Sequence, residues 1–322
     1  MKLGIFGTGI IAEKMSSTVI NMEGVKRYAI ASRNIEKAEA FKKKYHFEKA
    51  YGSYEDLLKD DEVDLVYIAT PHSRHFEDIK LCIENHKAVL CEKAFCVNSK
   101  QAKEIKELAN KEKVFVTEAM WPRYMPSRKL IDDVIQSGIV GRANILTANL
   151  SYPSSSIERM VNPNLAGGAL LDLGVYGLNF SLMHFGDDID RIESSCKMTN
   201  TGVDGMETIT IFYKDNRMSS LVHGIYSRSD RKGIIYGDKG YIVVENINNP
   251  NAIRVYDVED KLLKEIEVPK QITGYEYEMY ECKKCLEEER IESISMPLSE
   301  SIKLMEIIDK LKNDWGLKYP FE

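Results

Sequence analysis

The first 120 residues alternate short apolar runs with longer amphipathic stretches, and this alternation constrains the fold more than any other feature. The apolar runs have the length of buried strands, and the amphipathic stretches have the apolar periodicity of helices. Strands that alternate with helices form crossover units, so we expect a parallel sheet. The expected strands are residues 2–6, 25–31, 65–69, 88–91 and 114–117, and the expected helices are residues 11–21, 35–45, 75–85 and 99–112.

After Pro122 the pattern changes to successive β-rich segments separated by turn residues, which is typical of an antiparallel sheet. Three helical stretches are expected to cover one face of that sheet: residues 168–185, 275–289 and 299–311. A length of 322 residues also suggests two domains, because one domain usually has about 150 residues. We therefore expect an α/β domain at residues 1–121 and an α+β domain at residues 122–322, which binds the substrate and forms oligomers.

Composition excludes several classes of protein. Acidic residues exceed basic ones, 50 against 44, so no basic excess is available for binding nucleic acid. No apolar run approaches the roughly 18 residues that span a membrane, and the first predicted strand leaves no room for a signal peptide. We expect a cytoplasmic protein without a membrane or nucleic-acid partner.

The six cysteines lack the density and spacing of a disulfide framework. Cys282 and Cys285 form a single CxxC within a charged helical stretch, without the second ligand pair that a zinc site requires. We interpret them as cysteines on a helix surface and expect no metal site.

A glycine-rich turn follows the first predicted strand and opens the first predicted helix. In the segment Gly7-Thr8-Gly9-Ile10-Ile11-Ala12, the first glycine permits a tight turn, the second lets the backbone approach a pyrophosphate, and the alanine allows close packing of helix on strand. The N-terminus of the helix supplies unpaired N–H groups for phosphate. Strand, turn and helix thus follow the order of a Rossmann dinucleotide-binding domain. The predicted cofactor contacts are Gly7, Thr8, Gly9, Ile10 and Ile11.

The residues after the second strand favour NADP over NAD. An NAD site usually has an acidic residue here for the ribose hydroxyl, whereas this chain has Ser32 and Arg33, followed by Lys37. A hydroxyl and two cations suit the 2′-phosphate of NADP, which a guanidinium holds through two hydrogen bonds. A surface arginine, with NAD as the cofactor, is the alternative.

A polar segment follows the third predicted strand, where the carboxyl ends of parallel strands face the ligand crevice. We expect it to make polar contacts with the cofactor. The residues concerned are Ala69, Thr70, Pro71, His72 and His75. The two histidines could instead form a metal pair, but no acidic or cysteine partner accompanies them.

Glu92 and Lys93 come directly after the apolar run 88–91. Removing these charges from water costs several kcal/mol each, and pairing recovers that cost only with good geometry. The pair therefore indicates a cofactor or substrate site. A solvated loop after the strand is the alternative.

Asp172 and Tyr176 are four residues apart in an apolar stretch that follows two glycines, which places them on the same face of a helix. A carboxylate and a phenol aligned in this way could meet a substrate. A buried tyrosine hydrogen-bonded to a helix neighbour explains the spacing equally well.

Together these motifs resemble the Gfo/Idh/MocA oxidoreductases. The matching segments are residues 7–12, 32–33, 70–75, 92–93, 118–123 and 167–176. Within the family the chain is most similar to the branch of dimeric dihydrodiol dehydrogenase and NADP-dependent D-xylose dehydrogenase, including residues 316–320. The resemblance extends from end to end. It implies a Rossmann domain followed by an open-faced, mainly antiparallel sheet that often forms the dimer interface.

The resemblance also implies roles for individual residues. Lys93 is expected beside the nicotinamide, where its charge activates Tyr176 as the acid/base, while Asp172 orients the substrate. Trp121 and Arg123 are expected to line the substrate pocket. The implied reaction transfers a hydride between the nicotinamide and a secondary alcohol or hemiacetal carbon of a sugar, polyol or diol, in a homodimer or homotetramer.

One residue departs from the family pattern, because Ala94 stands where the family has proline. Proline fixes φ and favours a cis bond more than other residues do. The departure concerns the geometry of Lys93, so a non-catalytic NADP-binding regulator with the same fold is an alternative function. An enzyme that reduces a flat, non-sugar substrate is a third interpretation.

Overall fold

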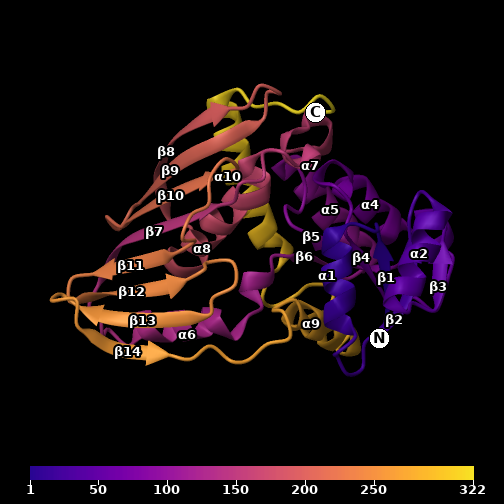
Figure 1. Cartoon of the computed structure of the whole chain (residues 1–322), viewed down its shortest axis with the longest axis horizontal. Coiled ribbons are helices and arrows are strands. Elements are labelled where there is room, and N and C mark those ends of the chain that lie inside the picture. The colour runs from indigo at the N-terminus through magenta and orange to yellow at the C-terminus, as the bar shows by residue number, and fades with distance from the viewer. The chain divides into compact units, whose positions relative to one another are not determined.

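A computed structural model describes all 322 residues, which form two compact units (Figure 1). The first unit comprises Met1–Tyr124 and Gln271–Glu306, and the second comprises Met125–Lys270 and Ile307–Glu322. The chain thus leaves the first unit at Tyr124, close to the predicted boundary at residue 121, and later returns to it.

The first unit contains a six-stranded parallel sheet in the order β3-β2-β1-β4-β5-β6, which is the strand order of a doubly wound dinucleotide-binding fold. The sequence prediction of a parallel sheet is confirmed. The strands are β1 (Lys2–Phe6), β2 (Lys26–Ala31), β3 (Lys49–Tyr51), β4 (Leu65–Ile68), β5 (Ala88–Glu92) and β6 (Val116–Ala119). Only β3, with three residues, was not predicted.

Helices of the first unit follow the strands as the crossover pattern requires. They are α1 (Ile10–Val19), α2 (Ile35–Tyr45), α3 (Tyr54–Leu58), α4 (His72–Glu84), α5 (Ser99–Glu112), the short η1 (Trp121–Arg123) and α9 (Glu276–Glu287). Helix α10 (Leu298–Trp315) begins in the first unit and ends in the second. Helix α4 begins at His72, three residues before its predicted start at His75, and this brings both histidines into its first turn.

Residues 271–306 pack on the free side of β6, the edge strand of the parallel sheet. The backbone N–H of Val116 donates to the carbonyl of Ile291 at 3.3 Å, and Thr117 Oγ1 donates to the carbonyl of Met296 at 2.9 Å. Covering an edge strand satisfies backbone groups that would otherwise be left unpaired. The sequence analysis expected α9 to cover the second sheet, and this is corrected here: an amphipathic pattern does not specify which sheet its apolar face meets.

The second unit contains an eight-stranded sheet in the order β14-β13-β12-β11-β7-β10-β9-β8. All its neighbouring strands are antiparallel except β7 and β10, so the predicted mainly antiparallel sheet is confirmed. The strands are β7 (Ala143–Ser151), β8 (Ile189–Met198), β9 (Asp204–Tyr213), β10 (Met218–Gly224), β11 (Gly233–Gly237), β12 (Gly240–Glu245), β13 (Ala252–Asp257) and β14 (Leu262–Ile266).

Helices of the second unit cover one face of this sheet. They are α6 (Pro126–Gln136), α7 (Glu158–Val161), η2 (Pro163–Leu165), the π-helical turn η3 (Leu170–Gly174) and α8 (Val175–Phe185). The turn η3 and helix α8 contact β7 and β10 directly. Side chains on the covered face, such as Leu146 and Leu221, are fully buried, whereas their strand neighbours Ile145 and Val222 on the opposite face are exposed.

The helical stretch Pro163–Phe185 is long and apolar enough to cross a membrane by length and composition alone, with a mean hydropathy of 1.3. The sequence analysis expected no apolar stretch of that length, so that expectation is corrected. Some 89% of the apolar window is buried inside the protein, which is the environment of a core helix. The predicted surface position of the CxxC cysteines is also wrong, because Cys282 and Cys285 are both buried on α9.

Candidate active site

The glycine-rich turn brings its backbone close to the chain that follows β4. Gly7 has a φ of +97°, and a Cβ there would lie 2.9 Å from the carbonyl oxygen of Ala69. Gly9 is the N-cap of α1 and makes no side-chain cap, while the space where its Cβ would lie is open. The first turn of a helix leaves its N–H groups without an intrahelical partner, and the open space at Gly9 lies beside this turn.

Two cations lie near the end of β2, next to this turn. Ser32 is buried, whereas Arg33 and Lys37 are exposed. Asn34 caps α2 by accepting a hydrogen bond from the backbone N–H of Lys37 at 3.0 Å, and its own N–H donates to Ser32 Oγ at 3.4 Å. The cap fixes the backbone between the two cations, so their stems start from defined positions.

His72 and His75 bind the backbone that follows β5. His72 Nε2 lies 3.2 Å from the carbonyl oxygen of Lys93, and His75 Nδ1 lies 2.8 Å from that of Ala94. The other ring nitrogen of His75 lies 2.9 Å from the carbonyl oxygen of Thr70. Burial lowers the pKa of His75, so its neutral ring donates to one of the two carbonyls. The Lys93–Ala94 peptide bond is cis.

The buried carboxyl groups of Glu92 and Glu118 form hydrogen bonds at the end of β5 and in the loop that follows it. Glu92 at the end of β5 accepts a hydrogen bond from the Tyr67 hydroxyl. Glu118 accepts from the backbone N–H of Phe95 at 3.0 Å and from Ser301 Oγ at 2.7 Å. Burial raises the pKa of Glu118 to about 7. The two members of the predicted charge pair therefore differ. Glu92 is buried and supports the loop that follows β5, whereas Lys93 lies on that loop.

Trp121 and Arg123 are held by the segment that covers β6. The Trp121 ring stacks on that of Tyr275, with centroids 4.4 Å apart and an interplanar angle of 2°. Arg123 is buried and forms an ion pair with Glu300 at 3.0 Å. The prediction that both residues line the substrate pocket stays a prediction. The ion pair gives Arg123 a structural role in the first unit as well.

In the second unit two adjacent glycines bring together chain segments that side chains would keep apart. A Cβ on Gly167 would lie 2.7 Å from the carbonyl oxygen of Arg159. Gly168 has a φ of +125°, and its N–H donates to the carbonyl of Met160 at 2.9 Å. The hydroxyl of Tyr319, buried near the C-terminus, donates to the carbonyl of Gly167 at 3.0 Å. Helix α7 is thereby fixed against the start of the helix that carries Asp172.

This backbone contact brings Arg159 close to Asp172, and the two side chains form two parallel hydrogen bonds. Arg159 Nη1 lies 2.9 Å from Asp172 Oδ1, and Nη2 lies 3.3 Å from Oδ2. The sequence analysis missed Arg159, since nothing in its spacing singles it out. The Gly167-Gly168 pair is the one sequence signal of a close contact here, and it does not name the partner.

Asp172 lies within the π-helical turn η3, and Tyr176 is the second residue of α8. The sequence analysis expected a continuous helix over residues 168–185 with both side chains on one face. The segment is helical without a break but begins as a π turn, and the placement of both side chains on one face stays a prediction. Tyr176 is buried, while the Asp172 side chain keeps 13% of its surface exposed. Short π-helical turns inside helices occur frequently at functional sites.

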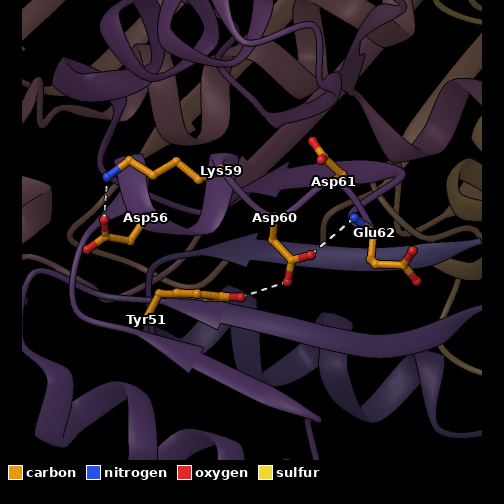
Figure 2. Close-up of a pocket in the computed structure, with 6 residues that line it drawn as sticks. All are labelled: Tyr51, Asp56, Lys59, Asp60, Asp61 and Glu62. Atoms are coloured by element: carbon orange, nitrogen blue, oxygen red, sulfur yellow. Dashed lines mark hydrogen bonds and ion pairs between the residues drawn. The ribbon is translucent and has the colours of Figure 1, made fainter.

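A surface hollow near α3 contains none of the predicted site residues (Figure 2). Its lining residues are Tyr51, Asp56, Lys59, Asp60, Asp61 and Glu62. Asp60 accepts hydrogen bonds from the Tyr51 hydroxyl at 2.6 Å and from the backbone N–H of Glu62 at 3.1 Å. An excess of carboxylates repels phosphate groups, so this hollow does not suit a dinucleotide.

Comparison with known proteins identifies relatives along the whole chain. Residues 1–120 match the model of an oxidoreductase family with an NAD-binding Rossmann fold, GFO_IDH_MocA, and residues 129–243 match the GFO/IDH/MocA C-terminal domain. The chain is 32% identical to trans-1,2-dihydrobenzene-1,2-diol dehydrogenase of Mus musculus, covering 99% of this chain and 98% of that protein. It is 34% identical to D-xylose 1-dehydrogenase (NADP(+)) of Hypocrea jecorina, covering 99% and 93%.

Solved structures share the fold at lower identity. A 3-ketoreductase from Actinomadura kijaniata, in complex with NADP and TDP-benzene, has a TM-score of 0.89 at 20% identity, and 97% of each chain is covered. Levoglucosan dehydrogenase, in complex with NADH and levoglucosan, has a TM-score of 0.86 at 17% identity, covering 98% of this chain and 97% of that one.

Replacing Gly168 with alanine should destabilise the second unit more than the same change at Gly202. Both residues have positive φ, but a Cβ at Gly168 would lie 2.1 Å from Asp204 Oδ1, whereas the space around Gly202 is open. Gly202→Ala should cost about 1–2 kcal/mol from backbone strain, and Gly168→Ala about 1–3 kcal/mol more from overpacking. Thermal and urea unfolding of the two variants measure the difference. Equal destabilisation would contradict the close contact.

Proposed function

Because the chain belongs to the GFO/IDH/MocA oxidoreductase family, we propose that it is an NADP-dependent dehydrogenase acting on a secondary alcohol or hemiacetal carbon of a sugar, polyol or diol. The observation that carries the proposal is the match, at 30% identity or more along almost the whole chain, to one dehydrogenase named for a diol and another named for a sugar. A cyclic 1,2-diol and xylose share one feature: two neighbouring carbons that each carry a hydroxyl group. We infer that the substrate carries such neighbouring hydroxyl groups.

The first unit supplies the cofactor contacts of this proposal. The open N-terminus of α1 fits a pyrophosphate, and Arg33 and Lys37 are exposed cations suited to a 2′-phosphate. Ser32 adds a hydroxyl at the same strand end. NADP is therefore favoured over NAD as the physiological cofactor. When bound, the nicotinamide accepts or supplies the hydride.

Lys93, Tyr176 and Asp172 are proposed to handle the substrate hydroxyl groups. Oxidation of an alcohol also requires removal of its hydroxyl proton, and a phenol with an ordinary pKa of about 10 is a poor base near neutral pH. A neighbouring ammonium favours the phenolate, so we assign the proton transfer to Tyr176 and the activating charge to Lys93.

Arg159 gives Asp172 a defined orientation in this proposal. A carboxylate offers about four lone-pair positions, and the two hydrogen bonds from Arg159 occupy two of them. We propose that this carboxylate contacts a hydroxyl group of a sugar or diol. A carboxylate held in this way orients a neighbouring hydroxyl group and keeps it out of the reaction.

The two alternative functions differ in measurable ways. A non-catalytic regulator would bind NADP without turning over any alcohol, and the dehydrogenases among its relatives argue against it. A reductase of a flat, non-sugar substrate would not need Asp172 to orient a second hydroxyl. Activity with NADPH that survives Asp172→Asn would favour that function.

Lys93→Met should lower kcat by at least about 100-fold, the usual contribution of acid–base assistance, while NADP binding is retained. The measurement is NADPH absorbance with a panel of sugars, polyols and diols, combined with NADP binding by fluorescence titration. Lys100→Met, which removes an exposed lysine from α5, is the control and should keep wild-type activity. Wild-type turnover by Lys93→Met would contradict the assigned role.

Arg33→Ala should weaken NADP binding by about 10- to 100-fold, the loss of charge-assisted hydrogen bonds to a phosphate, and leave NAD binding nearly unchanged. Isothermal titration with each cofactor measures the two affinities. Lys43→Ala removes an exposed cation from the same helix region and should change neither affinity. Equal loss for NADP and NAD would argue against a contact with the 2′-phosphate.

We also propose that the open face of the eight-stranded sheet forms a homodimer interface. This face carries exposed apolar side chains on four neighbouring strands: Ile145, Val222, Met206 and Tyr236. Tyr241 extends the row, because its ring lies between those of Tyr236 and Tyr256, with centroids 5.9 and 5.1 Å away. Contiguous exposed apolar surface of this kind usually marks an interaction site.

Val222→Glu should convert the dimer into monomers, since it places a charge at the centre of this face. Light scattering after size-exclusion chromatography measures the mass. Ile20→Glu changes a residue of similar exposure, 52% against 46%, at the end of α1 and should leave the mass unchanged. A Val222→Glu protein that keeps the mass of a dimer would show that the dimer uses another surface.

A further inference from the structure

Three buried ionisable side chains lie beneath the helical segment that carries Asp172 and Tyr176. Asp204 and Glu207 project from β9, and His223 projects from β10 directly opposite Glu207. Their exposed fractions are 0%, 2% and 1%. Ionisable groups are rarely buried so completely unless they are paired, so their hydrogen bonds need to be accounted for.

The three side chains reach the helical segment where it has glycines. A Cβ on Gly168 would lie 2.1 Å from Asp204 Oδ1, one on Gly174 would lie 2.2 Å from Glu207 Oε1, and one on Gly177 would lie 2.1 Å from His223 Nε2. The backbone N–H of Leu170 donates to Asp204 Oδ2 at 2.6 Å. The network therefore touches the segment on both sides of Asp172.

A hydrogen bond connects His223 to Glu207, but buried polar atoms of all three side chains lack a partner. His223 Nδ1 lies 2.8 Å from Glu207 Oε1, and burial lowers the pKa of His223 to about 3, so the neutral ring donates its N–H to the carboxylate. Asp204 Oδ1, Glu207 Oε2 and His223 Nε2 remain buried without a hydrogen-bond partner. Burial raises the pKa of each carboxyl to about 8. Two adjoining carboxyls that cannot both ionise keep a proton, and a proton shared between them supplies a donor for the two carboxyl oxygens.

We propose that Asp204, Glu207 and His223 form a buried positioning network that shares one proton and holds the segment 168–177, and with it Asp172 and Tyr176, in its working conformation. The effect on catalysis rests on the proposed function, whereas the effect on the segment does not. None of the three residues needs to touch the substrate.

The network should lose its stabilising effect at alkaline pH. Because the pKa of each carboxyl is raised above its unfolded value, the stabilisation is complete at low pH and is lost as the pH rises through about 8. His223 acts in the opposite direction, but only below its unfolded pKa of about 6.5. The other groups facing the pair are Cys196 on β8, whose pKa is raised to about 11, and Tyr319, whose pKa is raised further by burial. Asp172, held by Arg159, and Tyr176 lie on the segment itself.

Asp204→Asn and Asp204→Ala separate the shared proton from the hydrogen bonds. Asparagine can accept from the N–H of Leu170 and donate to Glu207, so it replaces the shared proton with an amide N–H that does not titrate. Alanine removes both contacts. The readout is amide hydrogen exchange of residues 168–177, corrected for intrinsic rates, near neutral pH and about one unit above the carboxyl pKa of about 8.

The wild-type segment should exchange at least about tenfold faster at the higher pH, Asp204→Asn should stay protected at both, and Asp204→Ala should exchange fast at both. If Asp204→Ala does not fold, the comparison of wild type with Asp204→Asn decides alone. Alkaline loss of protection in Asp204→Asn equal to that of the wild type would overturn the proposal, as would wild-type protection in Asp204→Ala.

Turnover adds a second readout. Asp204→Ala should lower kcat with an unchanged NADP dissociation constant, and Asp204→Asn should restore kcat near neutral pH while removing its alkaline decline. Wild-type kcat in Asp204→Ala would overturn the catalytic part of the proposal. A wild-type protein that turns over no sugar, polyol or diol refutes the proposed function, while hydrogen exchange still tests the network.

Discussion

The close approach of backbone at Gly167 and Gly168 is the constraint on which the second unit depends. On one side Gly167 lets the backbone of Arg159 and Met160 approach, which places the guanidinium on Asp172. On the other side Gly168 makes room for the carboxyl of Asp204, which also binds the N–H of Leu170. Any side chain at either position would separate these elements. Two residues without side chains thus orient the carboxylate proposed to meet the substrate.

Sequence alone predicted the parallel sheet and most of its helices, because alternating apolar runs and amphipathic stretches report burial directly. Strand β3 was missed because three residues carry too little pattern. The place of residues 271–306 was missed for a different reason: periodicity shows that a helix has a buried face but not which sheet it meets. The π turn at Asp172 was also missed, since it depends on contacts with β9 and β10.

The candidate site also has features that the sequence could predict and features that it could not. The glycine turn could be predicted because its chemistry is local to strand, turn and helix. The contacts of Lys93 and Asp172 could not, because His72 and Arg159 reach them through tertiary contacts that no spacing reveals. Family membership supplies the oxidoreductase class, while the buried groups of β9 and β10 were found only from the structure.

The backbone hydrogen bond from Val116 to Ile291 has a consequence for how the chain is made. During translation the parallel sheet is synthesised first, but β6 remains an open edge until residues 125–270 have left the ribosome and 271–306 can follow. An open edge invites pairing with other chains. The nascent chain therefore carries an uncovered sheet edge while the whole second unit is translated, which lengthens the time in which that edge can pair wrongly.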